Sequence, residues 1–459
     1  MKMKITALSL QMGENDFERR FVWYAEFKVK SAAVLYITKT EYLKQKSFEK
    51  AKKVFGSVEV VFNNADFVSC KVKIENLDPS SEYLYKVGDG EEFFDEIYSF
   101  KTPSKSQKRS FAIISDLHCM YKPENPKLWQ YRLPQWQNTI NQINNFDSNI
   151  SCLISGGDNI SSYNIGLEGD KEKLRLICEK EHEFLFEPEL MKSIPFATVM
   201  GNHEAQYYEK EDLDSSVMGY HFYMPNDDGG SGHVPKTTSG NFCFLSGNVL
   251  VIGLNFSVDI RGNYAKTDYE TNEKYVNFAV NKYPNSVWRV IVTHIQGFTF
   301  IGDSKGTETS YMMQKQDELC GKYKIDLMLT GHAHGFSRSY PIKNGKADKN
   351  VLQNINGVDT ICNSEGTVHY NIPSALNHSF TSVFSQFGNY VKSYGVAKMR
   401  SETPLMPDGF IEYDSPMFLH INVDETEEEN RMLIKVMQSK DLMSVDDFMI
   451  KKIKFLKNN

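Results

Sequence analysis

The sequence predicts a mixed α/β protein in which a layered, strand-rich domain follows an all-β domain. The first hundred residues contain about seven short alternating or β-branched segments, as all-β domains do. The rest of the chain alternates unbroken apolar runs with longer helical patterns, which is typical of layered α/β proteins. Five of these apolar runs lead directly to a polar or ionisable residue, so chemistry is expected where buried strands end.

The N-terminal segments predict a β-sandwich. Leu77-Asp78-Pro79 followed by Tyr83 resembles the corner before a late strand of fibronectin type III modules, where a tyrosine hydroxyl bonds back to the chain. The stretch 101–106, KTPSKS, has linker composition. We therefore expect a fibronectin-III-like domain over residues 1–103 and a second domain over 104–459. The expected strands cover 5–10, 21–29, 33–38, 58–62, 67–74, 83–87 and 97–100.

The second domain is expected to have four layers, with two sheets packed face to face and helices outside. Helical periodicity covers 127–146, where Leu133, Trp136, Ile140 and Ile143 share one side, and continues over 172–191. A hairpin is expected over 242–255, with its turn at Ser246-Gly247-Asn248. Near the C-terminus, strands over 418–423 and 432–438 flank an acidic turn.

Composition narrows the function classes. The chain has 459 residues and a formal net charge of −7, without the basic stripe that nucleic-acid or anionic-membrane binding needs. Its seven cysteines show no C-x-x-C pair, so neither a disulfide framework nor a zinc ribbon is expected. No apolar run approaches a membrane span and the first residues lack a signal-peptide core. A cytoplasmic protein is expected, or a secreted one if a leader has been removed.

The five apolar runs end on residue types that ligate metals. In open α/β sheets, ligands bind beyond the carboxyl ends of the strands, so these ends should deliver their side chains to one place. A carboxylate can bridge two cations, and a mixed set of oxygen and nitrogen ligands suits Mn, Fe, Zn or Co better than Ca or Mg. The motifs are Asp116-Leu117-His118, Gly156-Gly157-Asp158, Gly201-Asn202-His203-Glu204, His294 and Gly331-His332-Ala333-His334.

Each motif by itself is weak, because glycine before a polar residue is usually a turn and a single histidine is usually a hydrogen-bonded core residue. Their joint occurrence in this order is specific, and it resembles the calcineurin-like metallophosphoesterase superfamily. The resemblance implies two divalent transition-metal ions. It places Asp116, His118 and His334 on one ion, Asn202, His294 and His332 on the other, and Asp158 between them.

Other segments are similar to purple acid phosphatases, namely 82–90, 331–341 and 445–448 together with the N-terminal β-domain. One position departs from that family. The tyrosine that holds ferric iron there, three residues after the bridging aspartate, is Ser161 in this chain, and Tyr163 lies two residues further on. His118, which those enzymes usually lack, would replace the charged phenolate by a neutral imidazole. A colourless divalent pair is therefore expected.

The family implies an enzyme that hydrolyses small phosphate monoesters by attack of a hydroxide activated by the two metals. His203 is the candidate for protonating the leaving oxygen or holding the phosphate, and Glu204 for orienting its ring. Arg338 reaches phosphate or forms a structural ion pair. A phosphodiesterase with the same metals and a non-catalytic surface-binding protein remain alternatives. A small phosphorylated substrate is the expected partner, with no nucleic acid and no membrane, and the oligomeric state stays open.

Overall fold

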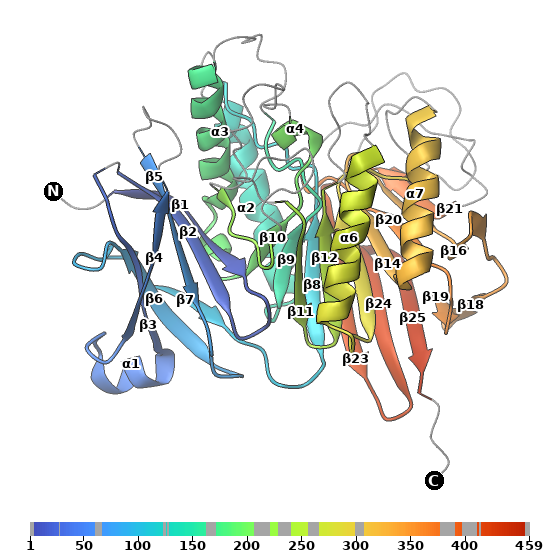
Figure 1. Cartoon of the computed structure of the whole chain (residues 1–459), viewed down its shortest axis with the longest axis horizontal. Coiled ribbons are helices and arrows are strands. Elements are labelled where there is room, and N and C mark those ends of the chain that lie inside the picture. The colour runs from blue at the N-terminus through green and yellow to red at the C-terminus, as the bar shows by residue number, and fades with distance from the viewer. Residues whose placement is uncertain are drawn as a thin grey trace.

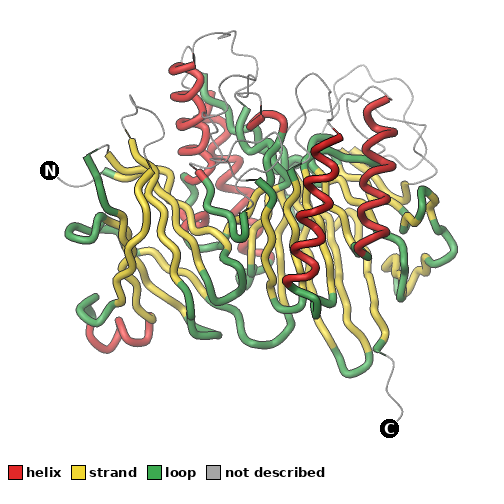
Figure 2. Tube along the Cα trace, in the orientation of Figure 1, coloured by secondary structure: helices red, strands yellow, loops and turns green. Residues whose placement is uncertain are grey.

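The computed structural model confirms a mixed α/β, strand-rich architecture with an N-terminal β-domain (Figure 1). Figure 2 shows strands through both domains and helices mainly in the second. No helix among the described residues is long and apolar enough to cross a membrane. The structure describes residues 4–26, 28–59, 67–122, 125, 128–161, 171–205, 221–227, 240–255, 266–298, 307–376, 391–396, 411–412 and 415–454.

Six of the seven expected N-terminal strands are present, and the seventh, expected over 58–62, begins earlier, at Lys52, with residues 60–62 outside the described residues. Strand β4 pairs with β3 through its first half and with β5 through its second half, so it passes from one sheet of the sandwich to the other. The predicted tyrosine corner is confirmed, because the Asp78 N–H donates to the Tyr83 hydroxyl at 2.8 Å. The elements are β1 (Ile5–Met12), β2 (Arg19–Glu26), β3 (Ala32–Thr38), α1 (Lys39–Gln45), β4 (Lys52–Glu59), β5 (Phe67–Ile74), β6 (Glu82–Gly88) and β7 (Tyr98–Lys101).

The first sheet of the second domain joins parallel central strands to an antiparallel C-terminal group. Strands β8, β9 and β10 are parallel neighbours, and β8 pairs on its other side with β23. The acidic turn lies between β23 and β24, as the sequence predicts. The strands are β8 (Arg109–Ile114), β9 (Cys152–Ser155), β10 (Phe196–Thr198), β18 (Leu352–Ile355), β19 (Val358–Cys362), β23 (Met417–Glu425), β24 (Glu429–Gln438) and β25 (Ser444–Ile453).

The second sheet is built on parallel strands β12, β13, β14 and β20. The expected hairpin forms its edge, where β11 pairs with β12 around Gly247. A two-stranded ribbon, β16 (Ile342–Lys343) with β17 (Lys346–Ala347), lies beyond β15. The strands are β11 (Phe242–Ser246), β12 (Val249–Leu254), β13 (Trp288–Thr293), β14 (Leu327–Thr330), β15 (Phe336–Ser339), β20 (Val368–Asn371), β21 (Val391–Val396) and β22 (Ile411–Glu412).

Helices cover the outer faces of both sheets. Trp136 on α2 is fully buried and its indole N–H donates to the Leu185 carbonyl at 2.9 Å, which ties α2 to α3. On the other sheet, Val276 of α6 and Leu319 of α7 pack on Ile252. The helices are α2 (Leu128–Phe146), α3 (Lys171–Phe186), the 3₁₀ turn η1 (Glu189–Lys192), α4 (Asn202–Ala205), α6 (Lys266–Lys282) and α7 (Thr307–Tyr323).

The two domains share one sheet. Strand β1 pairs in parallel with β10, with Gln11 opposite Phe196, so the sandwich extends the first sheet of the second domain. A buried ion pair between Asp16 and Arg109, at 2.6 Å, adds a second connection. Because β8, β9 and β10, which lead to Asp116, Asp158 and Asn202, belong to this shared sheet, the N-terminal domain braces this half of the framework of the site.

Candidate metal centre

The ends of five strands bring all seven predicted ligands into one cluster. Strands β8, β9 and β10 deliver Asp116, His118, Asp158 and Asn202 from one sheet, and β13 and β14 deliver His294, His332 and His334 from the other. The ligand atoms form three overlapping groups in which every atom lies within 4.8 Å of the others. These groups are Asp116 with His118 and His334, Asp158 with His118 and His203, and Asp158 with His294 and His332.

The backbone of this cluster is held in an unusual conformation. Five of the predicted ligands have positive φ angles, although only glycine adopts that region without strain. Each such residue costs about 1–3 kcal/mol, and such residues concentrate at functional sites. These backbone angles allow the aspartate and histidine of D-x-H and the two histidines of H-x-H to face the same space. The angles are 52° for Asp116, 46° for His118, 52° for Asp158, 68° for His332 and 58° for His334.

Two glycines allow the loops to approach closely. A Cβ on Gly201 would lie 2.1 Å from the Asp158 Oδ1 atom, and a Cβ on Gly157 would lie 2.7 Å from the Gly201 nitrogen. Gly157 also has a φ of +94°. The glycines of the G-G-D and G-N-H motifs are therefore required because the two loops pack backbone against backbone.

The first half-site consists of Asp116, His118 and His334. The His118 Nε2 atom lies 3.1 Å from the His334 Nε2 atom. The Asp116 Oδ1 atom is 3.5 Å from His334 Nε2 and 3.9 Å from His118 Nε2. Asp116 is fully buried and its carboxylate accepts the His332 N–H at 3.0 Å, which links this half-site to the other. One oxygen and two imidazole nitrogens therefore face a common point.

The second half-site consists of Asn202, His294 and His332. The Asn202 Oδ1 atom lies 3.0 Å from His294 Nε2 and 2.8 Å from His332 Nδ1. The Nδ1 atom of His294 lies 2.8 Å from the Gly156 carbonyl oxygen, which fixes its tautomer by accepting the ring N–H. Nε2 is then left as the ligating nitrogen, an arrangement typical of histidines that bind metals.

Asp158 lies between the two half-sites. Its Oδ1 atom accepts the His203 N–H at 2.8 Å, so Oδ2 is the oxygen that faces the cluster. Oδ2 is 3.2 Å from His294 Nε2 and 3.7 Å from His118 Nε2. One carboxylate oxygen thus lies close to a histidine of each half-site.

The ionisable groups of the cluster shift one another's pKa values. Burial raises the pKa of Asp116 above its ordinary value. Burial also acts to raise the pKa of Asp158, but His294 and His203 hold it well below its usual range. Burial acts to lower the pKa of His294, yet the Asp158 carboxylate raises it to about 9. Burial lowers the pKa of His332 to about 4 and that of His334 to about 3, so both rings are neutral, the form that binds metal.

The spacing of the donors fits bound cations. Two ligand atoms that are each about 2.1 Å from an ion lie about 3.0 Å apart at octahedral angles and about 3.4 Å apart at tetrahedral angles. Four of the five contacts that join donors within the half-sites run from 2.8 Å to 3.5 Å, and the fifth, between Asp116 and His118, is wider at 3.9 Å. Imidazoles, carboxylates and one amide oxygen converge in the cluster, so the donor set suits transition metals.

His203 lies beside the cluster and its side chain is 18% exposed. Its ring meets that of His118 edge to face at 4.4 Å, and its Nε2 atom is 3.8 Å from Asp158 Oδ2. The predicted role of Glu204 was wrong. Its buried carboxylate accepts the backbone N–H groups of Asp158 at 3.0 Å and Gly201 at 2.8 Å, because a buried carboxylate requires several donors. Glu204 therefore fastens two ligand loops together and does not orient the His203 ring.

Arg338 does not reach the cluster, so its assignment to substrate binding was wrong. It is 2% exposed and donates to Asp446 at 2.8 Å and to Asp359 at 2.8 Å. Its guanidinium also lies over the Phe448 ring, 4.6 Å from the centroid. A buried guanidinium needs such partners, and these fix β15 to the C-terminal strands. The structural ion pair was the correct alternative.

Ser161 stands at the position of the tyrosine ligand of purple acid phosphatases, so the first half-site has His118 where that family has a phenolate. Ser161 is buried and its N–H donates to a Glu181 carboxylate oxygen at 3.1 Å. Tyr163 lies outside the described residues. His221 is described, but it packs at the domain interface, where its carbonyl accepts from Gln11 at 2.8 Å.

Sequence patterns do not predict a role for Arg132 at the site. This half-buried side chain on α2 donates to the His118 carbonyl at 2.9 Å, so it supports a strained ligand loop from beneath. A single arginine in an amphipathic helix carries no pattern that would predict this contact. Cys119, the neighbour of His118, is buried, and burial raises the pKa of its thiol well above the usual value.

Comparisons with known proteins agree with this geometry. Residues 109–336 match the family model of the calcineurin-like phosphoesterases, and residues 5–102 match the purple acid phosphatase N-terminal domain. The chain is similar over its whole length to a purple acid phosphatase from yellow lupin seeds, with a TM-score of 0.63 at 16% identity, covering 98% of this chain and 75% of that one. At this identity the likeness shows the fold.

The chain also matches parts of two longer Arabidopsis thaliana proteins. "Probable inactive purple acid phosphatase 27" is 22% identical over 71% of this chain and 52% of its own length. "Purple acid phosphatase 21" is 24% identical over 60% of this chain and 54% of its own length. The chain thus spans about half the length of these curated relatives. With both domain models matched in order, the chain combines a purple acid phosphatase N-terminal domain with a calcineurin-like phosphoesterase domain.

Proposed function

We propose that this protein is a metal-dependent phosphomonoesterase that acts on small phosphorylated molecules. The observation that carries the proposal is the convergence of Asp116, Asp158 and four histidines with Asn202 at the ends of five strands. Two divalent cations in such a site supply a deprotonated water near neutral pH and neutralise charge on the phosphoryl oxygens.

The chain's own residues have distinct tasks in this proposal. Asp116, His118 and His334 would hold one ion, and Asn202, His294 and His332 the other. Asp158 would contact both through Oδ2. The carbonyl of Gly156 keeps His294 in the ligating tautomer, and the Glu204 carboxylate keeps the loops of Asp158 and Asn202 in register.

His203 is the proposed proton donor to the leaving oxygen. It lies next to His118 yet retains exposed surface, so a substrate can reach it. Burial lowers the pKa of His203. The Asp158 carboxylate, 3.8 Å away, acts in the opposite direction and would be the counterion of the protonated ring. A histidine that only binds the phosphate would lie at the same position. The turnover of the His203→Ala variant distinguishes this role from that of a proton donor.

A substrate pair tests the reaction class. We expect the protein loaded with Mn²⁺, Zn²⁺ or Fe²⁺ to hydrolyse nitrophenyl phosphate faster than bis-nitrophenyl phosphate. Asp158→Asn should remove both activities, which excludes a contaminating phosphatase. Preference for the diester would replace the proposal with the phosphodiesterase, its nearest alternative.

A non-catalytic protein on this scaffold is the candidate from another class. It is favoured by one observation, that some relatives bear the name of inactive purple acid phosphatases. Against it stands the full set of metal ligands in this chain. Stoichiometric binding of two ions by metal analysis supports the enzyme. Failure to bind any of these metals supports the non-catalytic protein.

A further inference from the structure

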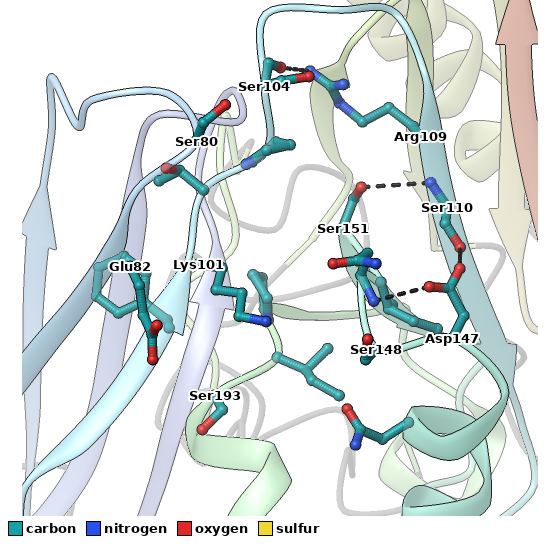
Figure 3. A pocket seen from close by; sticks show the side chains of 18 of the residues that line it. Ser80, Glu82, Lys101, Ser104, Arg109, Ser110, Asp147, Ser148, Ser151 and Ser193 are labelled. Carbon is teal, nitrogen blue, oxygen red and sulfur yellow. Dashed lines mark hydrogen bonds between the residues drawn. The ribbon is translucent and has the colours of Figure 1, made fainter. Parts of the chain in front are cut away.

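A second polar site lies at the opposite end of the strands that carry the metal ligands. A cavity of about 900 Å³ opens between the two domains (Figure 3). Arg109 and Ser110 at the start of β8, Ser151 just before β9 and Pro195 just before β10 all line it. The N-terminal domain contributes residues of β6 and β7, and the linker supplies the remaining wall. The cavity is therefore separate from the metal centre.

Hydroxyl and amide groups dominate the walls of this cavity. Nine of its 24 lining residues are serines and three are asparagines. Figure 3 shows that these hydroxyls come from both domains, with Ser80 on one wall and Ser148 and Ser151 on the other. Phe100, Ile150 and Ile194 add an apolar share. Such a surface offers many hydrogen bonds to a ligand that itself carries several hydroxyl groups.

The charges around the cavity leave an excess of positive charge. The Glu82 carboxylate is 2.8 Å from the Lys39 ammonium, and the Arg109 guanidinium is 2.6 Å from Asp16. Asp147 is paired with His420 at 3.0 Å. In contrast, Lys101 extends its ammonium into the space (Figure 3), and it has no side-chain partner among the described residues.

Lys108 also lines the cavity, and its ammonium likewise has no partner in the described part of the chain. The Glu82 carboxylate is thus neutralised from outside and the Asp147 carboxylate is held by hydrogen bonds to Ser110 and His420, whereas both lysines are left for a ligand. An oxyanion is the natural partner of such lysines, because charge-assisted hydrogen bonds to phosphate or sulfate are about twice as strong as neutral ones.

A catalytic role for this cavity is not supported. The Ser110 hydroxyl lies 2.9 Å from His420 Nε2, which superficially resembles a nucleophile with its base. However, Asp147 Oδ2 contacts the same His420 nitrogen, at 3.0 Å, and not Nδ1. A nitrogen that donates to the carboxylate cannot accept the serine proton, so the group is a hydrogen-bonded wall.

We propose that the interdomain cavity binds a small polyol that carries an oxyanion, namely a sugar phosphate or a sugar sulfate. Lys101 and Lys108 pair with the oxyanion, and the serines and asparagines pair with the hydroxyl groups. The volume is that of a small-molecule site and far exceeds what a free inorganic anion would fill. The bound ligand contacts both domains at once.

Calorimetric titration of the metal-loaded protein tests this site. The probes are glucose 6-sulfate and the phosphonate analogue of glucose 6-phosphate, neither of which a phosphoesterase hydrolyses, with glucose as the uncharged reference. We expect at least one charged probe to bind, and Lys101→Gln to weaken that binding at least about tenfold, the size of one charged hydrogen bond. Lys101 is exposed, so this variant should fold normally.

Two further variants locate the bound probe. Lys105→Gln removes an exposed lysine of the same segment that does not line the cavity, and it should bind as the wild type does. Asp158→Asn damages the metal centre and should leave binding of the sulfate unchanged. The proposal is overturned if glucose binds as tightly as both charged probes, if neither charged probe binds, or if Asp158→Asn abolishes binding while Lys101→Gln does not.

Discussion

Two groups of buried or half-buried histidines in this chain differ in their surroundings. In the metal centre, His118, His294, His332 and His334 surround two carboxylates, with the His294 Nε2 atom 3.2 Å from Asp158. At the domain interface, His182 and His221 stack face to face, with ring centroids 3.4 Å apart and planes 6° apart. Among the polar contacts of the two rings are the Cys178 carbonyl, 2.8 Å from His182 Nδ1, and the Tyr24 hydroxyl, 3.1 Å from His221 Nε2.

The difference shows what marks a metal site. Burial lowers the pKa of His182 to about 3, just as it does for His334, so a neutral buried ring is common to both groups. Only the metal centre adds carboxylates aimed at the same point and ligand residues with positive φ. We infer that the first group is built to bind cations and the second to fill an interface, and the four predictions below test this distinction.

The largest effect is expected from Asp158→Asn. This change keeps the shape of the side chain but removes the charge that contacts both half-sites. Two bound cations contribute several kcal/mol to the stabilisation of the transition state, and each 1.36 kcal/mol is a factor of ten in rate. We expect phosphatase activity to fall by about 10³-fold or more, with loss of bound metal measured by elemental analysis.

His182→Phe is the matched control for that change, because it replaces a buried histidine of the interface by a ring of similar shape. It should retain both metal ions and the wild-type turnover. Loss of metal from this variant, or two ions retained by Asp158→Asn, would contradict the assignment of the two histidine groups.

A smaller loss is expected from His203→Ala. The ring lies against His118 but is not among the seven predicted ligands. General acid catalysis contributes about 10²- to 10⁴-fold, so kcat should fall by about a hundredfold while metal content stays at two ions. If His203 only holds phosphate, KM rises and kcat changes little, and the effect is the same for a substrate with a good leaving group. Unchanged turnover would end its role.

The interface pair should make the fold sensitive to acid. The pKa of His182 is about 3 in the folded protein because of burial, against 6.5 for the free side chain. Between these values the unfolded chain binds more protons, so the free energy of unfolding falls as pH decreases from 6.5 toward 3. The expected loss is about 1.4 kcal/mol per pH unit for one histidine.

Urea unfolding at several pH values measures this effect. Because the phenyl ring of His182→Phe cannot be protonated, the variant should lose less stability than the wild type between pH 6.5 and pH 5. At pH 7.5, where both rings are neutral, the two proteins should differ little. Parallel loss of stability in both proteins would place the acid sensitivity elsewhere, for instance in the metal centre.

The sequence predicts the convergence of the candidate ligands for a physical reason. Its ligands stand at fixed positions after apolar strands, and parallel strands must end at a common edge, so the pattern of residues fixes their meeting. Glycine spacing carries the same information, because Gly157 and Gly201 are needed where two loops touch. Six of the N-terminal strands and the Tyr83 corner are predictable for similar reasons, since alternation and turn residues are local signals.

Contacts between segments that are far apart in the sequence produce no such local pattern. Arg338 follows G-H-A-H closely and so suggested a role at the site, but its strand turns the side chain toward Asp446, 108 residues away. Glu204 is adjacent to His203 in sequence, yet its carboxylate faces backbone N–H groups about 45 residues away. The interdomain cavity likewise depends on how two domains pack, which residue periodicity does not encode.

The smallest expected effect concerns colour. In purple acid phosphatases a tyrosine phenolate on ferric iron gives the visible band, and here Ser161 occupies that position while His118 completes the first half-site. A neutral imidazole in place of a phenolate favours a divalent ion, so the metal-loaded protein should have no strong visible absorption and Tyr163→Phe should leave its spectrum unchanged. An intense band that this variant bleaches would show that Tyr163 ligates the metal, and the first half-site would then belong to the purple type despite its additional histidine.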